Sequence, residues 1–370
     1  MELSEEYQQA WSAAGVATLT ALGGLEGAAR FLHPPEMPRL REWLRPYREE
    51  LARAGRAYSE MSPPPPLAAF HESFAEGITL TERALDLFLS TSNQQQAFLD
   101  VLAGLRTYCR ALEVFYGLHR FPPLSRYFVE PPFHDHLREL DPKPPEGVTV
   151  GLHHGGGERG PDTRGGFCLY IPESYDGEAH LPLVVALHGG YGSGRDFLWS
   201  WLREARGRRF LLLAPTSRAS TWQLSNPAND SHALRATIEF VASRWNVDRS
   251  HILLTGLSDG ATYALLEGLS EGAPYTHLAP VSGVLHPDNL TNGNLERARG
   301  RKIYLVHGML DWMFPVQTAE MARDKLLEAG AQLECRLLAD LSHTYPREEN
   351  DRVLAWFDPR LALPAAQPPQ

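Results

Sequence analysis

Three residues that together can cleave an acyl bond occur in one order along the second half of the chain. Ser258 stands inside the segment Gly256-Leu257-Ser258-Asp259-Gly260, and Asp311 and His343 follow it. A serine hydroxyl is a weak nucleophile until a base takes its proton, and imidazole suits that task because its unperturbed pKa is about 6.5. A carboxylate can hold the imidazole in the required tautomer and stabilise its cation. These residue types predict acyl transfer through a serine nucleophile.

The segment around Ser258 has the flanking pattern that such a nucleophile requires. The apolar run from Ile252 to Leu254 predicts a buried strand, and helix-forming residues extend from Ala261 to Leu269. A glycine two residues before the serine and another two residues after it permit a very tight turn between strand and helix. We therefore predict that Ser258 is the nucleophile, lifted out of the sheet at a strand-to-helix turn.

The predicted acid and base each follow a further strand. Lys302 to Val306 forms an apolar run, and Asp311 comes soon after it. Glu334 to Leu338 predicts the next strand, which precedes His343, the only histidine after Asp311. The order Ser, Asp, His is the one that this strand–turn–helix architecture uses. We predict His343 as general base and then acid, and Asp311 as the orienting carboxylate.

Two other carboxylates compete with Asp311 for the acid position. Asp288 precedes the strand that begins at Lys302, whereas Asp340 lies only three residues before His343. Both positions fit the expected order less well than Asp311 does.

A glycine-rich loop upstream predicts the donors for a developing oxyanion. The apolar run Leu183 to Leu187 predicts a strand, and it leads into His188-Gly-Gly-Tyr-Gly-Ser-Gly194. Such a loop can turn backbone N–H groups toward the substrate carbonyl. We expect the oxyanion hole to use the backbone N–H of Asp259 and that of Gly190 or Tyr191. The side chain of His188 is expected to brace the loop.

From about Arg164 to Pro359 the sequence resembles the α/β-hydrolases. Within them it is most similar to the esterases grouped with phospholipase/carboxylesterase and polyhydroxybutyrate-depolymerase-like proteins. The resemblance is carried by His188-Gly189-Gly190, Val247-Asp248, Gly256 to Gly260, Asp311 and His343. It implies a mostly parallel sheet with helices on both faces. One departure is Ala261, where many relatives have a second glycine.

Composition limits the compartment and the partners. With 370 residues, 43% hydrophobic and 22% charged, the chain suits two globular domains. A net charge of −10 argues against nucleic acid or an anionic membrane surface as the main partner. Three cysteines, an acidic N-terminus and the lack of an apolar run of 18 residues predict a cytoplasmic protein without disulfides or a membrane span.

We predict four parts along the chain. Residues 1–122 form an all-α N-terminal domain, 123–147 a proline-rich connector, 148–360 the α/β catalytic domain and 361–370 a flexible tail. The strongest helical periodicity runs through Phe98, Val101, Leu102, Leu105, Tyr108, Leu112 and Phe115. Three roles stay open for the helical domain: a cap over the site, partner binding, and homo-oligomerisation.

The predicted function is a serine hydrolase that cleaves small-molecule carboxylic esters through an acyl-enzyme on Ser258. It requires no cofactor, and no metal site is predicted, because the pairs His134/His136 and His153/His154 lack other ligands at a familiar spacing. Trp222 and Tyr191 are the predicted pocket residues. The alternatives are a serine peptidase of the same fold and, in a different class, a non-catalytic binding or scaffold protein.

Overall fold

The computed structural model describes residues 4–90, 94–156 and 163–364, and the chain divides into two compact units. Unit 1 is Met1–Phe128 and unit 2 is Val129–Gln370. The division falls six residues after the predicted end of the helical domain at residue 122. Of the predicted tail, Leu361 is buried and closes the helical turn Pro359–Leu361, whereas residues 365–370 lie outside the described residues.

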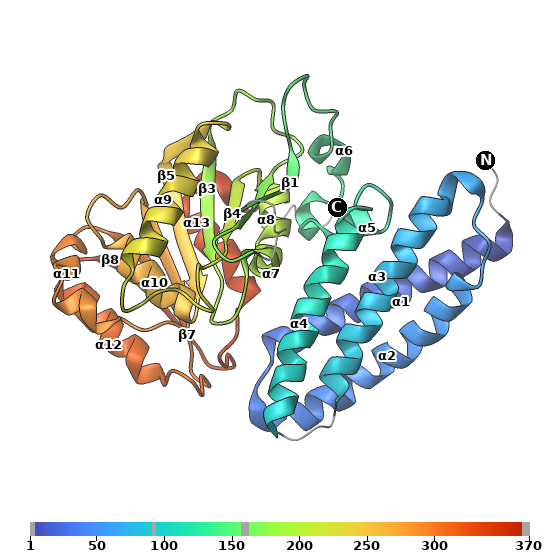
Figure 1. Ribbon diagram of the computed structural model, residues 1–370, viewed down its shortest axis with the longest axis horizontal. Helices are drawn as coiled ribbons and strands as arrows, with labels where there is room; N and C mark the ends of the chain where they lie inside the picture. Colours follow the sequence, from blue (N-terminus) through green and yellow to red (C-terminus); the bar gives the residue numbers. More distant parts are fainter. Residues whose placement is uncertain (1–3, 91–93, 157–162, 365–370) are drawn as a thin grey trace. The chain divides into compact units, whose positions relative to one another are not determined.

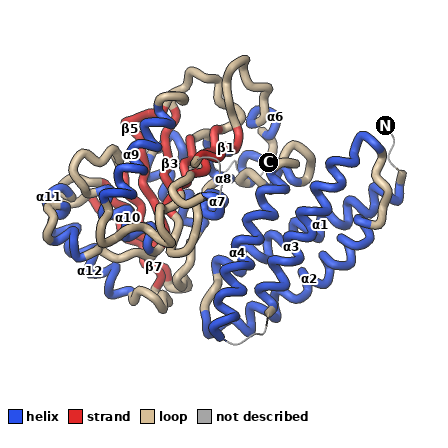
Figure 2. Tube along the Cα trace, in the orientation of Figure 1, coloured by secondary structure: helices blue, strands red, loops and turns tan. Residues whose placement is uncertain are grey.

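Unit 1 is an up-and-down arrangement of four long helices that lie side by side (Figure 1, Figure 2). They are α1 (Glu5–Arg30), α2 (Met37–Ser59), α3 (Ala68–Leu89) and α4 (Gln94–Tyr116), followed by the short α5 (Leu124–Tyr127). The Ser4 hydroxyl caps α1 by accepting from the backbone N–H of Tyr7. The proline run at residues 63–66 joins α2 to α3 and ends in a 3-10 turn, Pro65–Leu67. The all-helical character predicted for this region is confirmed.

Helices α3 and α4 approach closely because small residues lie at their contact. A Cβ on Gly77 would stand 2.4 Å from the Phe115 ring, and one on Gly104 would stand 2.9 Å from the Phe88 ring. The apolar stripe predicted on α4 supplies this contact, since Val101, Leu112 and Phe115 are buried. Burial of that stripe, rather than helix propensity alone, stabilises the bundle.

Unit 2 begins with short helical turns that two buried arginines hold. The turns are Pro131–Phe133 and α6 (Leu137–Leu140), within the predicted connector 123–147. Arg208 donates to Glu130 at 2.5 and 2.8 Å, and Arg206 donates to Asp141 at 2.5 Å. Both arginines lie on α8, so the first residues of unit 2 are fixed to the helical layer of the sheet.

The core of unit 2 is an eight-stranded, mostly parallel sheet in the order β1-β2-β4-β3-β5-β6-β7-β8. Strand β2 pairs antiparallel with both β1 and β4, and all pairs from β4 through β3 to β8 are parallel. The strands are β1 (Gly151–Gly155), β2 (Phe167–Ile171), β3 (Leu181–Leu187), β4 (Leu211–Pro215), β5 (Val247–Leu257), β6 (His277–Val281), β7 (Lys302–Gly308) and β8 (Gln332–Leu338). This confirms the predicted α/β-hydrolase class of fold.

Helices cover both faces of this sheet. They are α7 (Gly194–Phe197), α8 (Leu202–Arg208), α9 (Ala228–Ala242), α10 (Asp259–Gly268), α11 (Asn294–Arg297), α12 (Val316–Glu328) and α13 (Asn350–Phe357). One set of alternate strand residues, including Leu183, Val185 and Leu254, packs with α9, α10 and α12. The opposite face meets α13, where Trp356 lies 5.5 Å from the Tyr304 ring.

Three local features are not apparent from the sequence. Strand β1 was not predicted, because the sequence of this edge strand, Gly151 to Gly155, alternates little. The segment between β3 and β4 contains α7, a 3-10 turn and α8 rather than one continuous helix. Ser231 lies inside α9, where its hydroxyl hydrogen-bonds the hydroxyl of Tyr263. Among the described residues, no helix is both long and apolar enough to cross a membrane.

Candidate active site

Ser258 occupies the turn between β5 and α10 in a backbone conformation that is rare for a residue with a side chain. Its φ is 57° and its ψ is −119°. The turn is possible because its flanking glycines touch neighbouring backbone: a Cβ on Gly260 would stand 2.5 Å from the carbonyl oxygens of Leu187 and His188. A Cβ on Gly256 would stand 2.6 Å from the carbonyl carbon of Gly260. Gly256 and Gly260 are therefore required in this turn, because any side chain at either position would collide with neighbouring backbone.

His343 reaches Ser258 from the loop after β8. Its Nε2 lies 2.8 Å from the Ser258 hydroxyl oxygen. The loop is tied down on both sides of the histidine, because the backbone N–H of Leu310 donates to Leu341 and Arg347 pairs with the buried Glu204 at 3.2 Å. The lone C-terminal histidine and the predicted serine, 85 residues apart, thus meet at hydrogen-bonding distance.

Asp311 completes a chain of hydrogen bonds with these two residues. His343 Nδ1 donates to Asp311 Oδ2 at 2.8 Å, and the backbone N–H groups of Met313 and Phe314 donate to Oδ1 at 2.9 and 2.8 Å. The side chain of Asp311 is fully buried. Burial opposes its charge, but the hydrogen bonds from His343 and Phe314 outweigh burial and hold the pKa of Asp311 below its usual value.

The competing carboxylates lie elsewhere. Asp288 belongs to the 3-10 turn Pro287–Leu290, with a carboxylate oxygen 3.7 Å from His286 Nδ1. Asp340 is exposed in the loop that leads to His343. Of the three acids weighed from the sequence, the structure brings Asp311 to the imidazole.

The loop after β3 lies against the Ser258 turn and is fixed by buried groups. A Cβ on Gly189 would stand 3.5 Å from the Ser258 Cβ. The His188 ring is buried, with Nδ1 bonded to the carbonyl of Gly189 and Nε2 accepting from the backbone N–H of Ser217. Burial lowers the pKa of His188 to about 4. The expectation that His188 braces its loop therefore agrees with its contacts.

The two backbone N–H groups offered as alternatives on this loop differ in availability. The N–H of Tyr191 donates to the carbonyl of Ser220 at 2.9 Å, so it is already engaged. Among the described residues the N–H of Gly190 has no hydrogen-bond acceptor, and Gly190 lies beside the Asp259 side chain. The N–H of Asp259 is the first in α10, where helical amides have no intrahelical acceptor. Of the three amides considered from the sequence, those of Gly190 and Asp259 are therefore not engaged by an acceptor among the described residues.

The two predicted pocket residues differ in burial. Trp222 is 3% exposed, stacks on Tyr263 and donates its indole N–H to the carbonyl of His188 at 2.8 Å. It belongs to the core cluster and supports the loop after β3. Tyr191, within this loop, has a φ of 59° and its side chain is 66% exposed.

The sequence left one residue of this region without a role. His307, the penultimate residue of β7, is buried beneath the loop that carries Asp311. Its Nε2 lies 2.8 Å from the Phe314 carbonyl oxygen and 3.5 Å from Asp311 Oδ2. A histidine at the end of an apolar strand, four residues before the predicted acid, was the signal that could have found it.

The histidine pairs considered for metal binding make ordinary protein contacts. His136 lies 3.2 Å from the Glu139 carboxylate, and His154 lies 3.0 Å from the Cys168 sulfur. The His153 ring packs against Trp245 at 5.9 Å.

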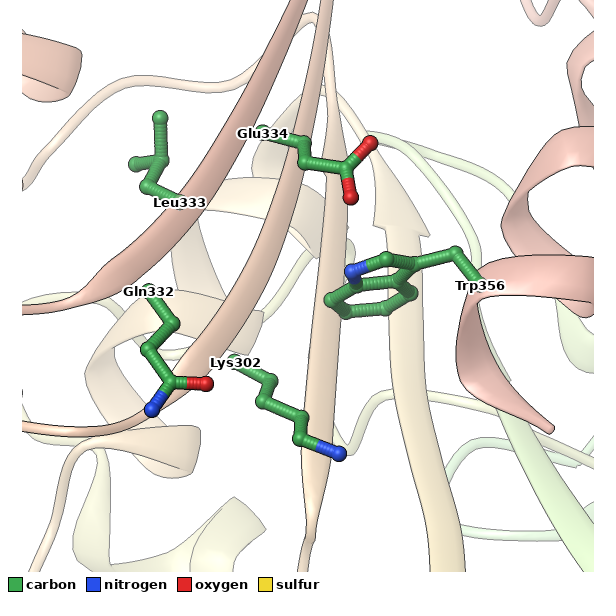
Figure 3. A pocket seen from close by; sticks show the side chains of 5 residues that line it. All are labelled: Lys302, Gln332, Leu333, Glu334 and Trp356. Carbon is green, nitrogen blue, oxygen red and sulfur yellow. The ribbon is translucent and has the colours of Figure 1, made fainter.

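A hollow of about 410 Å³ lies near the amino-terminal ends of strands in the sheet, whereas Ser258 follows the carboxyl-terminal end of its strand. It is lined by Lys302, Gln332, Leu333, Glu334 and Trp356, and Figure 3 shows the indole between Glu334 and Lys302. Lys302 and Gln332 begin β7 and β8, whereas Asp311 and His343 follow the ends of these parallel strands. The hollow is therefore separate from the hydrogen-bonded residues described above.

Comparisons with solved structures found similar chains at low identity. A thermostable esterase is 23% identical over 47% of this chain, with a TM-score of 0.40, and the match spans half of that protein's length. An acetyl xylan esterase from Aspergillus awamori is 16% identical over 56% of this chain and 98% of its own, with a TM-score of 0.45. An acylaminoacyl peptidase is 15% identical over 55% of this chain and 40% of its own, with a TM-score of 0.41. These similarities carry no information on the substrate.

The family comparison is more specific. Residues 225–357, about a third of the chain, match the profile of the Phospholipase/Carboxylesterase family, and this range includes Ser258, Asp311 and His343. No curated protein matched the sequence. The sheet order and the parallel strands independently give unit 2 its fold. Unit 2 therefore has an α/β-hydrolase class of fold, and its residues 225–357 are similar to the Phospholipase/Carboxylesterase family.

Proposed function

We propose that the protein is a serine hydrolase that cleaves carboxylic esters of small molecules through an acyl-enzyme on Ser258. The observation that carries the proposal is the continuous chain of hydrogen bonds: Ser258 to His343 at 2.8 Å and His343 to Asp311 at 2.8 Å. The family match makes hydrolysis the expected class of reaction. The roles of the three residues follow from their geometry.

In the first half-reaction, the Ser258 oxygen attacks the ester carbonyl carbon while its proton passes to His343 Nε2. Asp311 accepts from Nδ1, so it keeps Nε2 free to receive that proton and stabilises the resulting imidazolium. Collapse of the tetrahedral intermediate breaks the bond to the alkoxy oxygen, and His343 returns the proton to that leaving group. In the second half-reaction a water molecule gives a proton to His343 and attacks the acyl carbon; the bond to the Ser258 oxygen then breaks, and His343 returns the proton to that oxygen, which releases the acid and restores Ser258.

The negative charge that develops on the carbonyl oxygen needs donors that are already in place. The backbone N–H of Asp259 and that of Gly190 are our proposed donors, because the Tyr191 N–H bonds Ser220. Thr221, in the loop after β4, donates to the Asp259 carboxylate at 2.6 Å, and the adjacent Ser220 accepts from the backbone N–H of Tyr191, so this loop connects the two segments that carry these amides. Donors fixed before the reaction stabilise the transition state without further reorganisation.

Hydrolysis of amides is the second candidate, since the same groups could serve a peptide bond. The acylaminoacyl peptidase resemblance is too distant to favour it. Comparing kcat/KM on a short p-nitrophenyl ester with that on the matching aminoacyl p-nitroanilide separates the two. Ester hydrolysis predicts that the ester is the better substrate by a margin larger than its chemical reactivity alone gives.

The direct test compares two serines at neighbouring strand ends. Ser258→Ala should lower kcat on a p-nitrophenyl ester by about a thousandfold or more, because no nucleophile remains. Ser282→Ala is the matched control: Ser282 also follows a parallel strand, has a φ of 50° and is fully buried. It should keep most of the activity. Wild-type turnover by Ser258→Ala would refute the assignment, and a non-catalytic scaffold would show no serine-dependent turnover at all.

Other expectations stay predictions. The helical unit, predicted over residues 1–122, retains the three roles of cap, partner-binding surface and homo-oligomer contact. The cytoplasmic location and the independence from cofactors likewise await measurement.

A further inference from the structure

His307 lies where the loop carrying Asp311 leaves the sheet. It is the sixth of the seven residues of β7, and its side chain is fully buried. The mechanism proposed above does not use it. Burial of an imidazole is costly unless its nitrogen atoms find partners. Among the described residues only Nε2 of His307 has them and the buried Nδ1 has none, so the contacts of Nε2 indicate what the residue does.

The partners of His307 belong to the same loop as the acid, residues 309–315 between β7 and α12. His307 Nε2 donates to the carbonyl oxygen of Phe314 at 2.8 Å, because a carbonyl can only accept. The same nitrogen lies 3.5 Å from Asp311 Oδ2, the oxygen that accepts from His343. The backbone N–H of Phe314 in turn donates to Asp311 Oδ1. His307 and Asp311 therefore hold the two polar backbone groups of one residue, Phe314.

Phe314 also connects this loop to the base. Its ring meets the His343 ring edge-on, with centroids 5.2 Å apart. The residue after His307 brings the two loops together, because a Cβ on Gly308 would stand 2.2 Å from the carbonyl oxygen of Leu341. Displacement of the Phe314 backbone would thus disturb both the carboxylate and the ring that packs on the imidazole.

We propose that His307 is a positioning residue for the acid–base pair: its Nε2–H fixes the Phe314 backbone and so aims the Asp311 carboxylate at His343. The inference rests on the proposed function, because it assigns His307 to the same site. It differs from simple packing in one respect. A positioning role requires the N–H donor, whereas packing requires only the volume of the ring.

Two substitutions separate donor from volume. His307→Gln keeps an N–H donor near the position of Nε2, and His307→Leu keeps apolar bulk without a donor. On a p-nitrophenyl ester we expect His307→Leu to lower kcat roughly ten- to a hundredfold with little change in KM, since small misplacements of catalytic groups cost about this much. His307→Gln should recover most of the loss.

The pH profile gives a readout that a packing role would not move. An Asp311 carboxylate no longer aimed at Nδ1 stabilises the imidazolium less, so the acid limb of kcat/KM should shift to lower pH in His307→Leu. His277→Leu is the matched control. His277 is also a buried histidine in a strand. It is the first residue of β6, so it lies at the amino-terminal ends of the parallel strands, whereas His307 lies near their carboxyl-terminal ends. That variant should keep the wild-type profile.

A measurement without substrate keeps this inference separate from the proposed function. The His343 Nδ1 proton, which bonds Asp311, should give a low-field proton NMR resonance in the wild type and in His307→Gln, and lose it in His307→Leu. Loss of that resonance supports the positioning role even in a protein that cleaves no ester. An unchanged resonance and kcat in a folded His307→Leu would overturn it, as would equal losses in His307→Leu and His307→Gln.

Discussion

The carbonyl oxygen of Leu187 lies 2.5 Å from the point where a Cβ on Gly260 would stand. The contact joins the end of β3 to the first turn of α10, so the loop with the proposed oxyanion donor Gly190 is seated directly against the turn that carries Ser258. The absence of a side chain at Gly260 therefore permits the short separation between the Ser258 turn and the loop that contains Gly190.

Gly260→Ala should damage both stability and activity. The new methyl group would collide with backbone oxygens of Leu187 and His188, which cannot move like a flexible side chain. We expect a loss of about 3 kcal/mol in the free energy of unfolding, near the upper end for overpacking, and a kcat reduced at least tenfold. Urea denaturation and ester hydrolysis measure the two effects.

Gly23→Ala is the control for that substitution. Gly23 is exposed in α1, and a Cβ there would meet nothing within 4 Å. Alanine should stabilise the helix by about 0.5–1 kcal/mol and leave kcat unchanged. Equal behaviour of the two variants would show that the close contact at Gly260 has no consequence.

Asp311→Asn should lower kcat by roughly a thousand- to ten-thousandfold while the fold persists. An amide in place of the carboxylate can donate to Nδ1 and so favour the tautomer in which Nε2 carries the hydrogen, which blocks proton transfer from Ser258. Steady-state kinetics on a p-nitrophenyl ester provide the measurement. Asp288→Asn and Asp340→Asn serve as controls. A comparable loss of kcat in either variant would indicate that the substituted residue, rather than Asp311, is the orienting carboxylate.

Trp222→Phe distinguishes support of a loop from contact with substrate. The substitution removes the indole N–H that donates to the buried His188 carbonyl, at a cost of about 1–3 kcal/mol. A loosened loop should lower kcat about five- to tenfold and leave the preference among acyl chain lengths unchanged. Kinetics on a series of p-nitrophenyl esters of different acyl chain length test this expectation. An altered chain-length preference with normal kcat would indicate that Trp222 contacts the substrate.

Stability should fall in mildly acidic solution through His188. Its pKa is about 4 in the folded protein and about 6.5 when unfolded, so the unfolded state takes up the proton first as the pH falls. The contribution of His188 to the free energy of unfolding is fully present above pH 6.5. It is lost progressively as the pH falls toward 4, and the total loss is about 3 kcal/mol. Urea unfolding at several pH values measures the slope.

His188→Gln isolates that contribution, since other histidines, such as His277, also have a lowered pKa. The curve of unfolding free energy against pH should be shallower in this variant than in the wild type between pH 6.5 and 4. Parallel curves would mean that the His188 ring is protonated equally in both states.

Much of the site could be predicted because tight turns and single candidates constrain it. The turn at Ser258 tolerates only glycine at residues 256 and 260, so the five-residue segment 256–260 is enough to predict the position of the nucleophile. His343 had no rival after Asp311. Strand β3, the second half of β5 and most of β7 are buried apolar runs, and their parallel arrangement follows from the helices between them.

The remainder depends on partners that are distant in sequence. A tryptophan suggests a pocket as readily as a core, and the bond from Trp222 to the His188 carbonyl is visible only in the structure. The Tyr191 N–H was a reasonable oxyanion donor until Ser220, 29 residues away, proved to be its acceptor. His307 was inconspicuous because its role depends on the Phe314 backbone, whose position no periodic pattern encodes.

The most direct test of the central claim is covalent labelling by a fluorophosphonate followed by peptide mass spectrometry. The chain from Ser258 to Asp311 predicts rapid, stoichiometric phosphonylation of the Ser258 oxygen, and a rate that falls sharply in Asp311→Asn. Labelling spread over other serines, or none at Ser258 in the folded wild-type protein, would contradict the account.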